Sequence, residues 1–308
     1  MILTVCMSPS VDVTIELDSL NVGKVNVVKS KTLSFTGKAL NVAIGVARLG
    51  AEAFATGFMY NENGNMFERA LDKEGVPFSF VWNNGRVREN YKCIDKKSML
   101  TEINDVGGQV GNEKLVELLQ MIRTTSMRAD VTVISGGLPR DVAPDYYRDL
   151  FRAVDARSLR IADAEGAKLF AALDAGIDLV KPNLEELEET LGREFRDKAD
   201  MLAGCRELLD RGAKTVLLSL GKDGAIITDG KKNYYCKSIN VAVNSTVGAG
   251  DGMVAAAAAM LQQGAELPDI LRAGVAAGTA TVTTFGTISF TKNKYEEIFE
   301  GLNVTEFA

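Results

Sequence analysis

The feature that most constrains the fold of this chain is the alternation of short apolar or β-branched runs with stretches of helical spacing. Such alternation is typical of a mostly parallel sheet with helices on both faces. The pattern predicts strands at residues 2–7, 53–58, 131–134, 159–162, 178–180, 215–219 and 225–228. It predicts helices at 39–49, 115–124, 145–154, 184–191, 198–211 and 251–263. The expected fold class is therefore α/β, with one doubly wound domain over residues 1–308.

Two stretches do not follow this alternation. Residues 11–34 and 86–104 show strand-like patterns with charged residues and no long helix between the strands. They would pair most simply as a small antiparallel sheet that stands off the main body. Because open α/β sheets bind ligands at the carboxyl edge of their strands, we expect this small sheet to form a lid there.

Composition excludes several classes of function. The chain has no His, which rules out Ser-His-Asp and Cys-His nucleophiles and a His general base, so any acid or base is a carboxylate or a Lys. Its net charge of −6 and the absence of a basic stripe argue against nucleic-acid or membrane partners. The four cysteines form no CxxC pair, the start of the chain has the pattern of a strand and not of a signal peptide, and no apolar run reaches membrane-span length. A cytoplasmic location is expected.

The sharpest local signal is the glycine-rich run at residues 247–252, which precedes an apolar helix. Gly248 and Gly250 permit a tight turn, and the N-terminus of the following helix can hold an anion. Asp251 has two interpretations: an acid that complements the helix dipole, or a base that takes a proton from a hydroxyl attacking a bound phosphate. The run matches neither the P-loop nor the dinucleotide-binding fingerprint.

A second glycine-containing loop leads into a helix at residues 37–41. Gly37 allows a close approach to a ligand, and Lys38 and Asn41 lie one helical turn apart. Lys38 is either a ligand-binding cation or a solvated residue at a helix start. Farther along, Arg86, Arg88 and Asn90 alternate on one strand, so they either clamp a phosphate or form a charged outer face.

A third cluster, Lys181, Asn183 and Glu186, follows an apolar strand. Asn183 and Glu186 have the spacing of a helix capping box. The same groups also suit Mg²⁺ and nucleotide phosphates, because Mg²⁺ prefers oxygen ligands and Lys supplies a point charge.

Four motifs in fixed order resemble those of the PfkB (ribokinase-like) carbohydrate kinase family. They are Gly37-Lys38 with Asn41-Val42-Ala43, Lys181-Pro182-Asn183 with Glu186, Ser219-Leu220-Gly221 with Gly224, and Val247-Gly248-Ala249-Gly250-Asp251. The chain is most similar to the branch that phosphorylates ketohexose monophosphates, 1-phosphofructokinase and tagatose-6-phosphate kinase. The resemblance implies an α/β core with a β lid, ATP and Mg²⁺ as cofactors, and fructose 1-phosphate or tagatose 6-phosphate as the acceptor.

The resemblance also implies a role for individual residues. Asp251 is expected to be the catalytic base, with Gly248, Ala249 and Gly250 forming the anion hole. Substrate contacts are expected from Asp12, Gly37, Lys38, Asn41, Arg88, Asn90, Glu102 and Ser135, with Lys38 and Arg88 on the substrate phosphate. The nucleotide is expected at Lys181, Asn183, Ser219, Gly221, Gly224, Gly248, Gly250, Gly278 and the Gly286-Thr287 pair, and the metal at Asn183 and Glu186.

The chain departs from the family pattern at three places, one of which is Ser8, where the branch usually has Asn. The other two are a loop and a single residue after the expected base. Residues 35–39 read Phe-Thr-Gly-Lys-Ala where the branch has AGGKG, and Gly252 stands where it has Ser or Thr. The alternatives are a kinase for fructose 6-phosphate or an unphosphorylated sugar, and a non-catalytic sugar-phosphate sensor. An NAD-dependent oxidoreductase would need a glycine fingerprint after the first strand, which is absent. The family resemblance also implies a homodimer through the lid, in keeping with a small exposed sheet whose free edges invite pairing.

Overall fold

A computed structural model describes residues 1–97, 99–284 and 290–307, so Gly286 and Thr287 lie outside the described residues. Within those ranges the main sheet has ten strands in the order β14-β13-β12-β11-β10-β9-β8-β1-β4-β5. Neighbouring strands from β5 to β11 in this order pair in parallel. Each of β12, β13 and β14 pairs antiparallel with the strand that precedes it in the chain. Their bounds are β1 (Ile2–Cys6), β4 (Ala53–Tyr60), β5 (Phe78–Asn83), β8 (Val131–Ser135), β9 (Leu159–Asp163), β10 (Leu179–Val180), β11 (Val216–Ser219), β12 (Ala225–Thr228), β13 (Asn233–Cys236) and β14 (Val304–Phe307).

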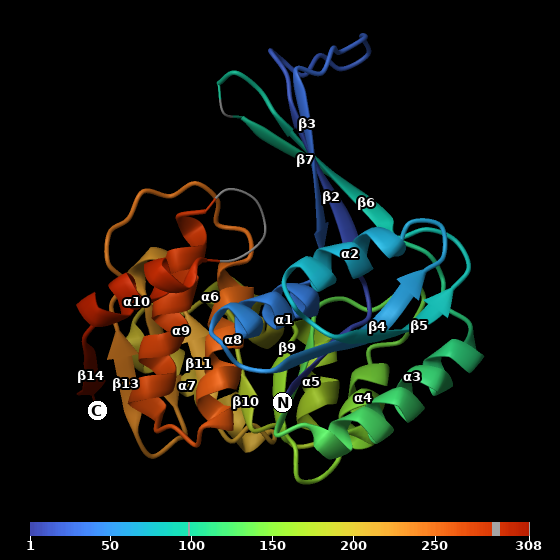
Figure 1. The fold of residues 1–308 in the computed structure, drawn as a ribbon. Coiled ribbons are helices and arrows are strands. Elements are labelled where there is room, and N and C mark those ends of the chain that lie inside the picture. The colour runs from blue at the N-terminus through green and yellow to red at the C-terminus, as the bar shows by residue number, and fades with distance from the viewer. Residues whose placement is uncertain (98, 285–289, 308) are drawn as a thin grey trace.

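Helices cover both faces of this sheet (Figure 1). One face packs against α1 (Lys38–Arg48), α2 (Asn65–Lys73), α8 (Ala249–Gln262), α9 (Leu267–Val282) and α10 (Lys292–Gly301). The other packs against α3 (Asn112–Thr125), α4 (Tyr146–Ala153), α5 (Gly166–Leu173), α6 (Leu184–Leu191) and α7 (Lys198–Asp210). Ile2 and Leu3 of β1 face opposite layers, as the strand period of two requires. The doubly wound α/β prediction is therefore confirmed. Of the helices described, none combines the length and apolarity needed to cross a bilayer.

All seven strands and six helices predicted from the sequence are present, with bounds that differ by a few residues. The elements missed were β5, β13, β14, α2, α5, α9 and α10. α9 was missed because it has Ala, Gly or Thr on every side, so its sequence carries little helical periodicity. β13 and β14 are short antiparallel strands with polar residues, which resemble loops in the sequence.

A second, small sheet stands off the main body above the carboxyl edge of the parallel strands (Figure 1). It contains β2 (Ser10–Glu16), β3 (Ser30–Thr36), β6 (Arg88–Ile94) and β7 (Leu100–Asn104), in the order β3-β2-β6-β7 for the described part of the chain. The expectation of a purely antiparallel sheet was wrong, because β2 pairs with β6 in parallel. The reason is that β2 follows β1 and β6 follows β5. Both therefore leave the same edge of the main sheet in the same direction.

Candidate active site

The candidate site lies where the carboxyl ends of the central strands meet the N-termini of two helices. Ser135 ends β8, Asp163 ends β9, and Lys181 directly follows β10. α1 begins at Lys38, and α8 brings Asp251 in its first turn. Because these strands are parallel, their polar terminal residues gather at one edge of the sheet.

Asp251 is a buried carboxylate held by a side chain from another helix. It is 6% exposed, and its Oδ2 accepts a hydrogen bond of 2.7 Å from Nδ2 of Asn41 in α1. Burial, and next the charge of Asp163, raises its pKa from 3.8 to about 7, although Asn41 and two lysines oppose the shift. The N-cap of α8 is Gly248, with a φ of 84° and no side-chain capping bond. Asp251 is therefore not a capping residue, and it has the basicity expected of a general base near neutral pH.

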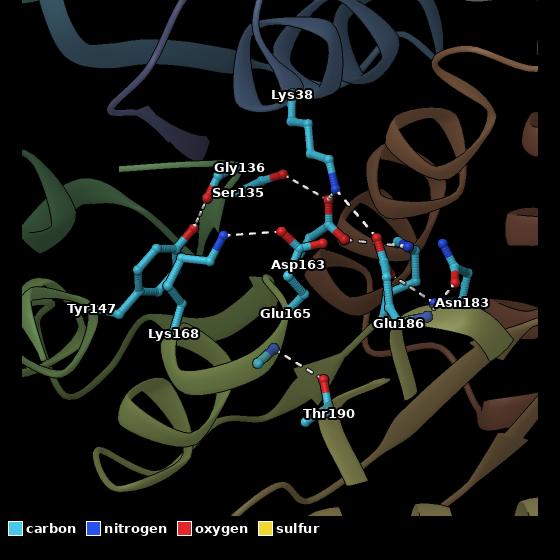
Figure 2. A network of polar contacts seen from close by, with 12 residues as sticks. Lys38, Ser135, Gly136, Tyr147, Asp163, Glu165, Lys168, Asn183, Glu186 and Thr190 are labelled. Atoms are coloured by element: carbon cyan, nitrogen blue, oxygen red, sulfur yellow. Dashed lines mark hydrogen bonds and ion pairs between the residues drawn. The ribbon is translucent and has the colours of Figure 1, made fainter. Parts of the chain in front are cut away.

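Asp163, which the sequence analysis missed, is the hub of the polar network in Figure 2. Its carboxylate accepts a hydrogen bond of 2.8 Å from Ser135 Oγ, and its two oxygens lie 3.2 Å from Lys181 Nζ and 3.6 Å from Lys38 Nζ. Burial raises the pKa of Asp163, but Lys181, Lys38 and Ser135 outweigh this effect and bring it down to about 2. The sequence signal was a lone Asp at the end of a predicted strand. Ser135, predicted to contact the substrate, donates its hydroxyl hydrogen bond to this carboxylate and so orients it.

The cluster at residues 181–186 contains the capping box that its spacing predicts. Asn183 and Glu186 form a capping box on α6: Glu186 N–H donates to Asn183 Oδ1 at 2.7 Å, and Asn183 N–H donates to Glu186 Oε2 at 2.8 Å. The other oxygen of Glu186 lies 3.6 Å from Lys38 Nζ. Asp163, followed by Glu186, raises the pKa of Lys38, so its ammonium stays charged. Lys38 thus connects Asp163 and Glu186 (Figure 2).

The donor set at this edge fits Mg²⁺ bound mainly through phosphates and water. Within the described ranges no group of three or more carboxylate or thiol side chains could enclose a metal. Mg²⁺, however, usually takes one or two carboxylates and completes its shell with water and substrate phosphates. Asp163 and Glu186 are the two carboxylates that would hold Mg²⁺ here, and the side-chain oxygen of Asn183, the other predicted ligand, accepts the capping hydrogen bond.

The small sheet presents a polar row to the same region. Asp12 on β2 accepts hydrogen bonds from Lys92 Nζ at 2.9 Å and from Asn90 Nδ2 at 3.2 Å, both on β6. Lys92 was missed by the sequence analysis, although Arg88, Asn90 and Lys92 follow the period of two that places side chains on one strand face. Arg88 Nε and Asn90 Oδ1 are buried without a hydrogen-bond partner among the described residues. Unpaired buried polar atoms are costly, so this row is suited to a polar ligand.

The surroundings of three other predicted contact residues are as follows. Glu102 is exposed on β7, opposite Lys92, and Arg86 forms an exposed ion pair with Glu89 before β6. Gly37, with a φ of 156°, leaves no room for a side chain, because a Cβ there would be 2.7 Å from Cys6 Sγ. It therefore lets α1 begin against the end of β1.

A pocket of about 320 Å³ opens beside the N-terminus of α8. Of the residues expected to bind the nucleotide, its wall contains Ser219, Gly221, Gly224, Gly250 and Gly278. Most of the rest of the wall comes from α8, from α9 and from residues 238–246; its side chains are mainly apolar, and Ser238, Thr246 and Thr279 add hydroxyl groups. Lys181 and Asn183 are not part of this wall, but the Lys181 ammonium would lie 3.3 Å from a Cβ on Gly250. An apolar pocket next to a charged loop suits a nucleobase joined to phosphates.

The comparisons with known proteins agree with this geometry. The family model for pfkB family carbohydrate kinases matches residues 6–294. The chain belongs to this family. It is 29% identical to 1-phosphofructokinase of Vibrio cholerae over 92% of the chain and 90% of that protein. It is also 29% identical to tagatose-6-phosphate kinase of Staphylococcus epidermidis over 99% of the chain and all of that protein. A solved structure of phosphofructokinase-2 from Escherichia coli in complex with potassium matches with a TM-score of 0.90, 28% identity and coverage of 97% and 98%.

Membership identifies the enzyme class and its cofactors. This pfkB kinase is a phosphotransferase that acts on a sugar hydroxyl and uses ATP with Mg²⁺. The alternative of an NAD-dependent oxidoreductase is therefore wrong.

Proposed function

We propose that this pfkB kinase transfers the γ-phosphoryl group of ATP to a hydroxyl of a ketohexose monophosphate, fructose 1-phosphate or tagatose 6-phosphate, and so forms the bisphosphate. The observation that carries the proposal is the buried Asp251 beside the glycine-rich start of α8, held by Asn41. The names of the relatives from V. cholerae and S. epidermidis support this acceptor class. Arg88 and Lys92 on the small sheet supply cations for the phosphate that the acceptor already carries.

In the proposed reaction, the hydroxyl oxygen of the acceptor attacks the γ-phosphorus of ATP. The bond from that phosphorus to the β–γ bridging oxygen breaks, ADP leaves with the electron pair, and Asp251 takes the hydroxyl proton. The backbone N–H groups at residues 248–250 stabilise negative charge on the transferring group. Asp163 and Glu186 would hold Mg²⁺, whose positive charge would offset the negative charge of the nucleotide phosphates.

The small sheet positions the acceptor over this reaction centre. Asp12 is a buried carboxylate that accepts hydrogen bonds, so a sugar hydroxyl can replace one of its present donors, Lys92, Asn90 or Ser10. We propose that the sheet acts as a lid made of residues 11–34 and 86–104, and that it excludes water, which would otherwise accept the phosphoryl group. Glu102 is proposed to contribute at the rim of this lid.

A second acceptor is favoured by one observation. Phosphofructokinase-2 from E. coli, to which the chain is structurally similar, has also been solved in complex with fructose 6-phosphate, with a TM-score of 0.86 and 26% identity. Fructose 6-phosphate therefore belongs in any substrate test.

The test measures ADP formation from ATP and Mg²⁺ with fructose 1-phosphate, tagatose 6-phosphate, fructose 6-phosphate, fructose, ribose and adenosine. Asp251→Asn is assayed beside the wild type, with the exposed Asp210→Asn as the matched control. We expect activity on one or two phosphorylated ketohexoses, a loss of about 10²-fold to 10⁴-fold in kcat for Asp251→Asn, and no loss for Asp210→Asn. Binding of sugar phosphate without turnover of any acceptor would instead support a sensor.

We propose two further properties. The chain works in the reducing cytoplasm, which is supported by its four cysteines, all buried and free. Two copies associate through the small sheet, because it exposes apolar side chains such as Leu33 and Ile103. A related E. coli phosphofructokinase-2 has been solved in a tetrameric form, which shows assembly in a related protein.

A further inference from the structure

Cationic side chains reach the acceptor region from two separate parts of the fold. Lys92 comes from the small sheet and contacts Asp12 at 2.9 Å. Lys38 comes from the main body, where it begins α1, and its ammonium reaches Asp163 at the end of β9 and Glu186 in α6 (Figure 2). The family resemblance places Lys38 on the phosphate that the substrate brings with it, but these contacts favour another role.

We propose that Lys38 contacts the phosphoryl group in transfer and that Lys92, with Arg88, holds the phosphate already on the acceptor. This inference rests on the proposed function, because it assigns two lysines to opposite ends of the same acceptor. Lys38 would then be a catalytic residue and Lys92 a binding residue.

The position of Lys38 follows from what the transfer requires. The acceptor hydroxyl must meet Asp251, and the γ-phosphate must lie toward the carboxylates that hold Mg²⁺. The transferring group therefore passes between Asp251 and Glu186. Lys38 Nζ lies 3.6 Å from Glu186 Oε1, and its charge acts on Asp251. Its ammonium thus lies beside Glu186 and Asp163, the carboxylates toward which the γ-phosphate is directed.

Lys38 is also available for a new anionic partner. Its two ion pairs, each 3.6 Å long, exceed the length of a normal hydrogen bond, and its side chain is 42% exposed. Lys181, by contrast, is 3% exposed and pairs closely with Asp163. Gly136 lies beside the Lys38 stem, since a Cβ at that position would be in ordinary van der Waals contact with Lys38 Cβ at 3.4 Å.

The experiment compares Lys38→Met with Lys92→Met, and uses Lys38→Arg to restore charge and the exposed Lys73→Met as the control. Steady-state kinetics are measured at pH 8.5, because at this pH the Asp251 carboxylate remains ionised even when the Lys38 charge is lost. Calorimetry measures binding of the sugar phosphate alone, and of sugar phosphate with ADP, Mg²⁺ and aluminium fluoride, which imitates the phosphoryl group in transfer. Thermal melting verifies that each variant is folded.

For Lys38→Met we expect kcat to fall by about 10²-fold to 10³-fold, with the Kd for sugar phosphate changed less than about threefold. The same variant loses the tight aluminium fluoride complex, and Lys38→Arg recovers part of both properties. Lys92→Met raises the KM and Kd for sugar phosphate by about tenfold or more, and Lys73→Met changes neither constant.

Two outcomes would overturn the inference, and they are distinguishable. In the first, the wild type is active, and Lys38→Met binds sugar phosphate tenfold more weakly but keeps the wild-type kcat and the aluminium fluoride complex. Lys38 would then contact the acceptor phosphate, and only this inference would fail. A wild type inactive on every acceptor would overturn the proposed function as well.

Discussion

At the scale of single residues, the site is organised by two carboxylates with opposite electrostatics. Asp163 and Asp251 are both buried, yet the pKa of Asp163 falls to about 2 and that of Asp251 rises to about 7. Asp163 has an ion pair with Lys181 and a hydrogen bond from Ser135, whereas the one hydrogen bond to Asp251 comes from a neutral amide. Two nearby carboxylates with separated pKa values suit distinct roles. Asp163 thus stays ionised and pairs with cations, while Asp251 exchanges a proton.

The first prediction concerns pH. Because Asp251 must be ionised to accept a proton, kcat/KM should fall about tenfold per pH unit below pH 7 and level off above it. A pH profile of initial rates with the best acceptor measures this fall. The acceptor phosphate itself titrates near pH 6, so its calorimetric Kd over the same range serves as the correction. A corrected profile that stays flat between pH 6 and pH 8 would contradict the assignment of Asp251 as base.

The second prediction is that the same carboxylate lowers stability. The pKa of Asp251 in the folded protein lies above its ordinary value of 3.8, so its stabilising contribution is complete below about pH 4 and is lost as pH rises through 7. Asp251→Asn should therefore unfold at higher denaturant concentration than the wild type at pH 8. Between pH 5 and pH 8 its advantage should grow by about 3 kcal/mol.

Urea unfolding at several pH values tests this, with Asp210→Asn as an exposed Asp-to-Asn control. The control should differ from the wild type by nearly the same amount at every pH. If Asp251→Asn behaves like the control, burial of its charge does not destabilise the protein.

At the scale of elements, α8 occupies its place because small residues allow close helix packing. A Cβ on Gly45 of α1 would lie 2.7 Å from Ala255 Cβ, and one on Gly278 of α9 would lie 2.8 Å from Met253 Cγ. Gly252 belongs to the same set, because a Cβ there would lie 2.6 Å from Thr281 Oγ1 and 3.1 Å from the Ala277 carbonyl oxygen. Gly252, which replaces the Ser or Thr of the family pattern, therefore accommodates Thr281 on the facing helix α9. Close packing brings Asp251 to Asn41.

The third prediction follows from this contact. Gly252→Ala should destabilise the protein by about 1–3 kcal/mol, because the added methyl group forces α8 and α9 apart, although Ala is the better helix former. Adding Thr281→Ala should recover much of the loss. The measurement is the free energy of unfolding for both single variants and the double variant.

Gly301→Ala is the matched control, because this glycine also lies in a helix but has open space around it. It should gain up to about 1 kcal/mol. Equal destabilisation by Gly252→Ala with and without Thr281→Ala would show that Thr281 is not the obstacle.

At the scale of the whole molecule, the small sheet has one polar face and one apolar face. Asp12, Asn90 and Asn104 share the polar face, as the strand register shows. Leu33, Val13, Tyr91 and Ile103 form the adjacent row, which points to the opposite face. Val13 is fully buried, but Leu33 is 43% and Ile103 57% exposed at the two edge strands. These exposed edges are where a second copy is proposed to bind.

The fourth prediction is that charge at these edges prevents association. Leu33→Lys together with Ile103→Lys should convert the protein to a monomer in sedimentation velocity experiments, because burying two ammonium groups at an interface is costly. Val116→Lys on α3 is the control for an exposed apolar-to-charged change and should leave the mass unchanged. A wild type that sediments as a monomer at all concentrations would contradict association through the sheet.

The sequence by itself determined most of the elements and much of the chemistry. The alternation of strands and helices required the doubly wound sheet, and Gly248, Gly250 and Asp251 are local signals, readable because turn geometry and helix polarity act over a few residues. The family motifs added the enzyme class. The expected lid segments were also visible as strand patterns without a helix between them.

The tertiary structure decided which of these groups meet. Asp163 lies far from Lys38 and Lys181 in sequence, and only the shared edge of the parallel strands brings the three together. Lys92 likewise reaches Asp12 through a parallel pairing of β2 with β6 that the sequence did not predict. Contacts and pKa values depend on long-range pairing and burial, which no local pattern encodes, so the environment of each charge is a property of the folded molecule.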